Sequence, residues 1–197
     1  MLASGSPARL RLLHDAGIEP VVVVSGADES GEDGLDTAVL VAMLAERKAA
    51  TVSALRPADL VLGCDSMLDL DGDPLGKPAT AGEVVDLWRR LAGHEAVLYT
   101  GHRLIDGQSG RQACGVAATI IRFGEPTDAE ITTYAATGEP LQLAGGFSID
   151  GRGAAFVDGI DGDPGNVIGL SLPLLRRLLA ELDIAITDLW RPPAPPG

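Results

Sequence analysis

The sequence predicts an α/β protein, on the strength of three observations. Apolar, β-branched runs at residues 20–25 and 60–65 have the composition of buried strands. Between such runs lie stretches with helical periodicity that begin at capping residues and end at glycine. The chain has 197 residues, 46% of them hydrophobic, so it can bury a sizeable core as one large domain or as two small lobes.

The first helix is predicted over residues 7–16, after a short apolar strand at residues 2–4. Ser6 is a good N-cap, Pro7 suits the first helical position, and Gly17 suits the residue that ends a helix.

The next segments read as strand, loop and helix. The run at residues 20–25 does not alternate with polar residues, so we expect a strand covered on both faces. A Gly- and acid-rich loop follows over residues 26–36, and a long helix over residues 37–55 carries Lys48 near its middle.

The middle of the chain predicts strands and hairpins around one helix. The expected elements are a buried strand that ends at Asp65 (60–65), a hairpin turning at Asp71-Gly72 (67–75), an amphipathic helix (80–91), and two long strands joined by a hairpin connection (96–105 and 112–123).

The last third begins with a capping box, Thr127 and Glu130, which predicts a helix to about residue 137. Glycine turns then alternate with expected short strands to residue 170, and a final helix is expected over residues 172–182. We expect the proline-rich tail at residues 191–197 to be disordered.

Charge and hydropathy limit the class of partner. The chain has 15 basic and 28 acidic residues, a net charge of −13, so its average surface repels polymeric nucleic acid and anionic lipid. A small phosphorylated ligand remains compatible, because a few cations and a divalent metal can reverse the field inside one cleft. With no long apolar run and no signal-peptide pattern at its start, we expect a cytoplasmic protein without a membrane partner.

The cysteines and histidines do not form a recognisable site. Cys64 and Cys114 are too few for a disulfide framework, so we expect two reduced, buried thiols. His14, His94 and His102 are scattered without metal-ligand spacing, and we expect structural roles for them.

The turn at residues 4–9 has the features of an anion site. Ser4 and Ser6 supply hydroxyls, the first helical turn supplies unpaired amides, and Arg9 can add a bidentate contact. The alternative is an ordinary strand-to-helix turn.

Asp65 is the best single candidate for chemistry, since ligands gather at strand ends in open α/β sheets; its alternative is a turn-capping aspartate. Lys77, between Gly76 and Pro78, could aim an ammonium at a phosphate or simply face solvent as a hairpin lysine. Lys48, flanked by alanines on a buried helix, calls for an anionic partner unless its side chain snorkels to water.

A second carboxylate follows the strand at residues 20–25. Glu29 and Asp65 could together hold Mg²⁺ or Mn²⁺ through oxygen ligands. The alternative for Glu29 is an acidic surface loop.

Several short motifs occur together in the order typical of the Maf family, and the chain resembles that family over almost its whole length. The motifs are residues 2–9, Asp28-Glu29, Lys48-Ala49, 63–66, 76–78, 99–101, Tyr134 with 138–140, 144–147 and 166–170. The resemblance implies a single domain over residues 1–190 with the two-lobed, mixed-sheet α/β fold of inosine triphosphate pyrophosphatases and a nucleotide cleft between the lobes.

The resemblance also implies a function. It implies a nucleoside triphosphate pyrophosphatase that cleaves between the α- and β-phosphates, yields a nucleoside monophosphate and pyrophosphate, uses Mg²⁺, Mn²⁺ or Co²⁺, and forms a homodimer. Removal of modified nucleotides from the pool is one expected role. The assigned residues are Asp65 (proton acceptor), Lys48 and Lys77 as catalytic groups, Ser4, Ser6, Arg9, Ser66 and Asp150 for substrate binding, and Glu29 and Asp65 for metal.

Three positions depart from the family's pattern. Many relatives have arginine where this chain has Ala8, and the pyrimidine-preferring branch has threonine and glutamine where this chain has Ser66 and Asp150. Base preference is therefore open. Because an ionised carboxylate only accepts hydrogen bonds, Asp150 favours a base edge that presents N–H donors. A nucleotide-binding regulator of cell division or septum formation, with little or no catalysis, is the alternative function.

Overall fold

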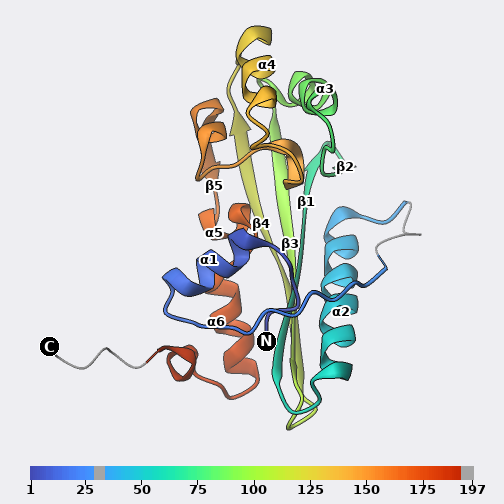
Figure 1. Cartoon of the computed structure of the whole chain (residues 1–197), viewed down its shortest axis with the longest axis vertical. Coiled ribbons are helices and arrows are strands. Elements are labelled where there is room, and N and C mark those ends of the chain that lie inside the picture. The colour runs from blue at the N-terminus through green and yellow to red at the C-terminus, as the bar shows by residue number, and fades with distance from the viewer. Residues whose placement is uncertain (29–33, 192–197) are drawn as a thin grey trace, which may run out of the picture.

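The computed structural model describes residues 1–28 and 34–191. Within them, six α-helices pack around one five-stranded sheet with the strand order β2-β1-β3-β4-β5 (Figure 1). The predicted α/β class is confirmed. The strands are β1 (Leu60–Leu70), β2 (Asp73–Leu75), β3 (Glu95–Asp106), β4 (Gln112–Phe123) and β5 (Val157–Asp161).

The sheet is antiparallel at every strand pair. The mixed sheet expected from the resemblance is reduced to isolated parallel bridges from Leu2 to Val22 and to Leu62. The hairpin turn at Asp71 and Gly72 is confirmed, with φ values of 55° and 86° that match the twist of the flanking strands. β1 runs five residues past the predicted end, because residues 66–69 continue in register along β3 and Leu70 pairs with Asp73 of β2.

Five of the six helices described in the structure match the prediction from capping signals, and α5 was not predicted. They are α1 (Pro7–Asp15), α2 (Thr37–Leu55), α3 (Ala81–Leu91), α4 (Asp128–Ala136), α5 (Pro164–Ile168) and α6 (Leu172–Glu181). Ser6 caps α1 by accepting from the Arg9 amide, and Thr127 and Glu130 form the predicted capping box of α4. Short 3-10 turns lie at Ala144–Gly146, Arg152–Phe156 and Ile186–Leu189.

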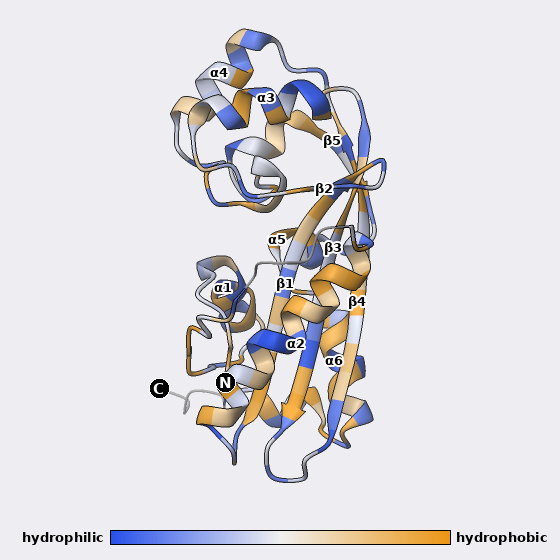
Figure 2. Cartoon of the chain, turned by 90° about the vertical axis from the view of Figure 1, so that its right-hand side faces the viewer, coloured by the Kyte–Doolittle hydropathy of each residue, from blue (hydrophilic) through white to orange (hydrophobic). Residues whose placement is uncertain are grey.

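The helices gather at the two ends of the long strands (Figures 1 and 2). At one end α3 and α4 pack on the sheet around Trp88, which is fully buried. At the other end α2 lies on one side of the strands and α1 and α6 lie on the other, with a second apolar core that includes Leu104 and Leu178. The long strands extend from one group of helices to the other (Figure 1).

Several predicted strands are wrong. Residues 2–4 form only isolated bridges at Leu2, and the short strands expected between residues 139 and 151 are replaced by turns and by the 3-10 turn at Ala144–Gly146. Residues 20–25 bridge to another segment only at Val22, and Val21 and Val24 are 58% and 69% exposed. The non-alternating pattern indicated burial on both faces, but this segment lies outside the sheet edge and lacks a covering layer. Residues 166–170 contain the end of α5, because the Asp163 side chain caps a helix that begins at Pro164.

Some predictions fall outside the described residues, namely Glu29 and the tail from residue 192 onward. In the described part of the chain, no helix combines the length and apolar character needed to cross a membrane.

Candidate functional site

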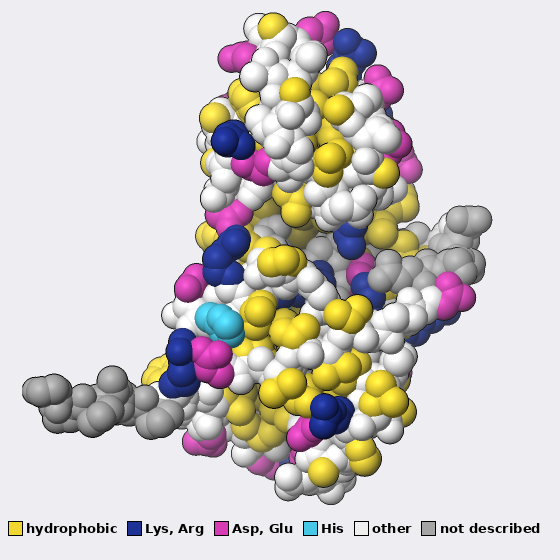
Figure 3. Space-filling view, viewed as in Figure 1, with side chains coloured by type: hydrophobic (Ala, Val, Ile, Leu, Met, Phe, Trp, Pro, Cys, Tyr) yellow, Lys and Arg dark blue, Asp and Glu magenta, His cyan; other side chains and the backbone are white. Residues whose placement is uncertain are grey.

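A cavity of about 860 Å³ opens between the two groups of helices. Its walls come from residues 3–9 and Arg11, residues 24–27, Lys48, Ser66 and Lys77, residues in the range 139–151, and residues 167–169. On the face shown in Figure 3, Lys and Arg side chains gather around the hollow at the waist of the molecule. The volume lies within the range of ordinary small-molecule sites.

The cavity forms where one edge of β1 is left open. The N-terminal segment bonds along this edge at Leu62, and β2 pairs with it only from Leu68 onward. Between these points Asp65 and Ser66 are adjacent residues whose side chains project from opposite faces of the sheet. Groups from α1 on one face and from α2 on the other therefore meet at this edge.

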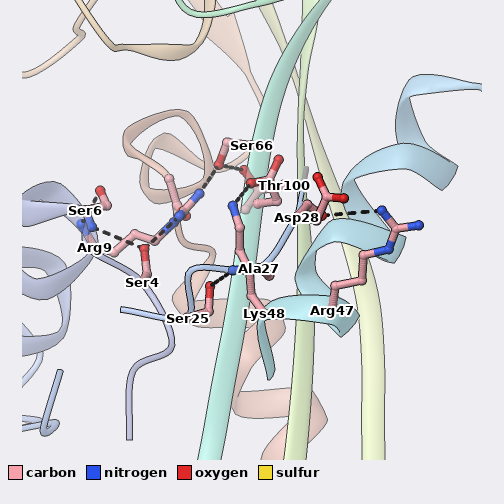
Figure 4. Close-up of polar contacts among 12 residues, drawn as sticks. Ser4, Ser6, Arg9, Ser25, Ala27, Asp28, Arg47, Lys48, Ser66 and Thr100 are labelled. Carbon is pink, nitrogen blue, oxygen red and sulfur yellow. Dashed lines mark hydrogen bonds and ion pairs between the residues drawn. The ribbon is translucent and has the colours of Figure 1, made fainter. Parts of the chain in front are cut away.

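Arg9 is the centre of the α1 side of the site (Figure 4). Its side chain is 7% exposed. Nε donates to the Gly169 carbonyl at 2.7 Å, and the two terminal nitrogens donate to Ser4 Oγ at 3.0 Å and Ser66 Oγ at 2.8 Å. No carboxylate of the described residues forms an ion pair with it. A buried guanidinium held by neutral oxygens alone favours an anionic ligand.

Ser66 belongs to a directed chain of hydroxyl groups. Thr100 Oγ1 donates to the Asn166 carbonyl at 3.2 Å, so the hydroxyl of Ser66 donates to Thr100 across 2.9 Å. Ser66 therefore accepts from Arg9 and donates to Thr100. This arrangement fixes the guanidinium on the cavity wall.

Lys48 and Asp65 form a buried ion pair on the α2 side. The Lys48 ammonium donates to Asp65 Oδ1, and the two residues are 8% and 4% exposed. Lys48 lines the cavity and Asp65 lies behind it. The predicted need of Lys48 for an anionic partner is confirmed.

Glycines in the strands allow α2 to approach closely enough for this pair. A Cβ at Gly101 would lie 2.2 Å from the Val41 carbonyl oxygen, and one at Gly63 would lie 2.3 Å from that of Ala45. Gly101 is the register partner of Asp65. The helix backbone therefore packs directly on the strands beside the catalytic candidate.

Lys48 and Lys77 are the only two lysines in the chain, and both line the cavity. The other 13 basic residues are arginines. Lys77 is exposed at the cavity wall. The wall carries four cationic side chains, Arg9, Arg11, Lys48 and Lys77, and two carboxylates, Glu139 and Asp150. Together with Asp65, the described residues of the site carry four positive and three negative side chains, in a chain of net charge −13.

The wall opposite the strands holds two anchored carboxylates. Glu139 accepts from the Arg152 and Gly153 amides at 3.0 Å each, and from the Tyr134 hydroxyl at 3.1 Å. Burial alone would raise the pKa of Glu139, but these hydrogen bonds hold that pKa below its usual value. Asp150 accepts from the Arg11 guanidinium and from the Ser148 hydroxyl.

The structure brings most of the predicted site residues together. Ser4, Ser6, Arg9, Ser66, Lys48, Lys77 and Asp150 all line one cavity. The expectation that Asp65 ends a strand is wrong, because β1 continues to Leu70 and Asp65 lies in its middle. The parallel-sheet argument for Asp65 does not apply to an antiparallel sheet; its position follows from the open edge of β1.

Sequence reasoning missed three wall or support residues: Arg11, Thr100 and Glu139. Thr100 and Glu139 lie inside motifs typical of the Maf family, at residues 99–101 and 138–140, and had no predicted role. The low lysine count was a further signal, because both lysines are at the site.

The cysteines and His102 serve other roles. Cys64 is buried, and burial raises its pKa to about 12. Cys114 is exposed, so the expectation of a buried thiol is wrong there; it alternates outward on β4. His102 is buried, accepts from the Ser171 amide, and donates to the Thr100 carbonyl. Burial lowers its pKa to about 4, which fits the predicted structural role.

Of the two carboxylates predicted to hold a metal ion, Glu29 and Asp65, the structure describes only Asp65. No group of three or more His, Cys, Asp or Glu side chains suited to a metal occurs within residues 1–28 and 34–191. Magnesium is commonly held by one or two carboxylates together with substrate phosphates. Asp65 fits that requirement, and Glu29 lies outside the described residues.

Comparisons with known proteins identify the family of this chain. The sequence model of the family described as Maf-like protein matches residues 1–182. A protein of Streptomyces coelicolor is 56% identical over 98% of this chain and 94% of its own length. Proteins of Cutibacterium acnes and Nostoc punctiforme are 49% and 47% identical, over 98% and 97% of this chain and 95% and 97% of their own lengths. All three are named nucleoside triphosphate pyrophosphatase. The chain therefore belongs to the Maf family.

Proposed function

We propose that this protein hydrolyses nucleoside triphosphates between the α- and β-phosphates, releasing a nucleoside monophosphate and pyrophosphate. One observation carries the proposal: the buried Arg9 guanidinium lines the cavity and is held by neutral oxygens within the described residues. A triphosphate supplies the missing negative charge. The names of the relatives support the same activity.

The cations of the site have a direct role in this reaction. Arg9, Lys48 and Lys77 offset the charge of the triphosphate and of the leaving pyrophosphate. A bound phosphate offers the Lys48 ammonium another anionic partner. When the ammonium moves from Asp65 toward the phosphate, the Asp65 carboxylate becomes accessible to water, and it then orients or deprotonates the attacking water.

We also propose that the reaction depends on a divalent cation, Mg²⁺, Mn²⁺ or Co²⁺. Asp65, together with Glu29, would hold it, and the bound cation would stabilise charge on the phosphates and lower the pKa of a coordinated water.

Product analysis tests the activity. The purified protein is incubated with a panel of normal and modified nucleoside triphosphates and each of the three metals, and the phosphorus products are identified by ³¹P NMR. Monophosphate with pyrophosphate is expected, and EDTA should stop its formation. Diphosphate with orthophosphate would contradict the bond assignment, and full activity in EDTA would contradict the metal requirement.

Lys77→Ala offers a test that is separate from folding. Because Lys77 is exposed, its truncation should leave thermal stability unchanged while kcat/KM falls at least tenfold. Arg90→Ala is the matched control, since Arg90 is an exposed cation that pairs with Asp73 on α3 and β2, away from the cavity. Equal kcat/KM for both variants would remove Lys77 from the site.

The alternative function is a nucleotide-binding regulator of cell division. Ala8, at a position where many relatives have arginine, supports this alternative because one cation is missing. Tight binding of nucleotides without turnover in the same panel would favour that function. We keep a cytoplasmic location and a homodimer as further proposals; Val116 and Ile120, both exposed on β4, are apolar residues that a second copy would cover.

A further inference from the structure

We propose that Arg11 is a specificity-determining residue that reads the base of the nucleotide, with Asp150 as its positioning residue. Arg11 would favour bases with a carbonyl oxygen at position 6 of a purine or position 4 of a pyrimidine. Bases with an amino group at the same position would bind less tightly. The inference rests on the proposed function, because it takes a nucleotide as the ligand.

The position of Arg11 separates it from the phosphate end of the cavity. Arg9 and Arg11 both belong to α1 and line the same cavity. Two residues along a helix turn a side chain by about 200°, so the two guanidinium groups occupy different parts of the wall. Arg9 reaches the edge of β1, whereas Arg11 reaches Asp150.

The surroundings of Asp150 suit a base. Phe147 and Ile149 lie in the same wall segment as Asp150 and line the cavity. Apolar surface beside a few directed polar groups is the usual lining of a site for a flat, partly polar ring.

The hydrogen bonds of Asp150 change what this wall can recognise. Both carboxylate oxygens already accept, one from Ser148 and the other from Arg11, and the Arg11 charge compensates that of the carboxylate. A guanidinium has five N–H donors, so Arg11 keeps donors for a ligand while Asp150 holds it in place. The sequence alone favoured a base whose N–H groups donate to Asp150. On the present proposal, Arg11 instead donates to an oxygen of the base.

Stability does not account for this pair. Arg11 and Asp150 are 54% and 35% exposed, and exposed ion pairs contribute little to folding. Within a nucleotide site, the same donor discriminates against an amino group, because two donors then face each other.

Binding of α,β-methylene analogues tests the inference without requiring turnover. Dissociation constants for the analogues of GTP, UTP, ATP and CTP, and for inorganic tripolyphosphate, are measured by calorimetry for the wild type, Arg11→Ala, Asp150→Asn, the double variant and the control Arg90→Ala. The wild type should bind the oxo pair more tightly than the amino pair. Arg11→Ala should lower that preference about tenfold and leave tripolyphosphate binding unchanged. Asp150→Asn should lower the preference less, and should add nothing in the double variant.

Two results would overturn the inference: a base preference in Arg11→Ala within twofold of the wild type, or an equal loss of all four analogues and of tripolyphosphate, which would make Arg11 a phosphate ligand. Absence of monophosphate and pyrophosphate from hydrolysable nucleotides would instead count against the proposed function, so the two failures are distinguishable.

Discussion

Gly101→Ala should both destabilise the protein and lower its activity, because it pushes α2 away from the sheet. The new Cβ would lie 2.2 Å from the Val41 carbonyl oxygen, where ordinary contact begins at 3.4 Å, so the helix or strand must yield by about 1.2 Å. Overpacking of this kind costs about 1–3 kcal/mol. For a protein of this size the melting temperature should fall by about 2–12 °C.

The activity loss follows from the geometry of the ion pair. Lys48 lies seven residues after Val41, on the same face of α2, and Gly101 is opposite Asp65 in the sheet. A displacement of about 1 Å at reacting groups can cost about 100-fold in rate. We therefore expect kcat to fall by one to two orders of magnitude.

The assay compares thermal unfolding and kcat of Gly101→Ala with those of Gly82→Ala. Gly82 lies in α3, and a Cβ there would meet only Thr80 Oγ1, at 3.9 Å, so the control should be neutral or slightly stabilising. A melting temperature within 1 °C of the wild type, or unchanged kcat, would refute the close-packing argument.

Four further predictions concern the buried ion pair, the two cysteines and His102. Lys48→Met leaves the Asp65 carboxylate buried without its ammonium partner, and should lower the free energy of unfolding, measured in urea, by about 3–5 kcal/mol. Asp65→Asn should abolish turnover and retain nucleotide binding. Near-normal turnover in Asp65→Asn would exclude Asp65 as the base. A thiol reagent at pH 8 should label Cys114 but not Cys64, whose raised pKa keeps it protonated; two thiols labelled in the native protein would contradict this. His102 has a pKa of about 4 when folded against an ordinary 6.5, so the unfolded chain binds more protons between these values and stability should fall by about 3 kcal/mol as pH drops from 7 to 4. His102→Gln should flatten this dependence, and an unchanged pH profile in that variant would assign it to other groups.

Local signals in the sequence predicted most of the elements. Caps such as Ser6 and Thr127, the Asp71-Gly72 turn and the glycines after helices act over three or four residues, so helix and hairpin positions can be read without knowing the fold. The run at residues 20–25 shows the limit of this reasoning. Its composition is that of a buried strand, but whether an apolar run is covered depends on distant segments, and here it lies outside the sheet.

The site divides in the same way. Residue chemistry and order along the chain identified Arg9, Lys48, Asp65, Lys77 and Asp150 as candidates. Their arrangement depends on long-range packing: the close approach of α2 over Gly101 and the open edge of β1 decide that Lys48 covers Asp65. The pairing of Asp150 with Arg11, 139 residues away in sequence, likewise has no local signal. Hydrogen-bond partners contributed by distant segments are set by tertiary contacts, and these decide what each charged group at the cavity can recognise.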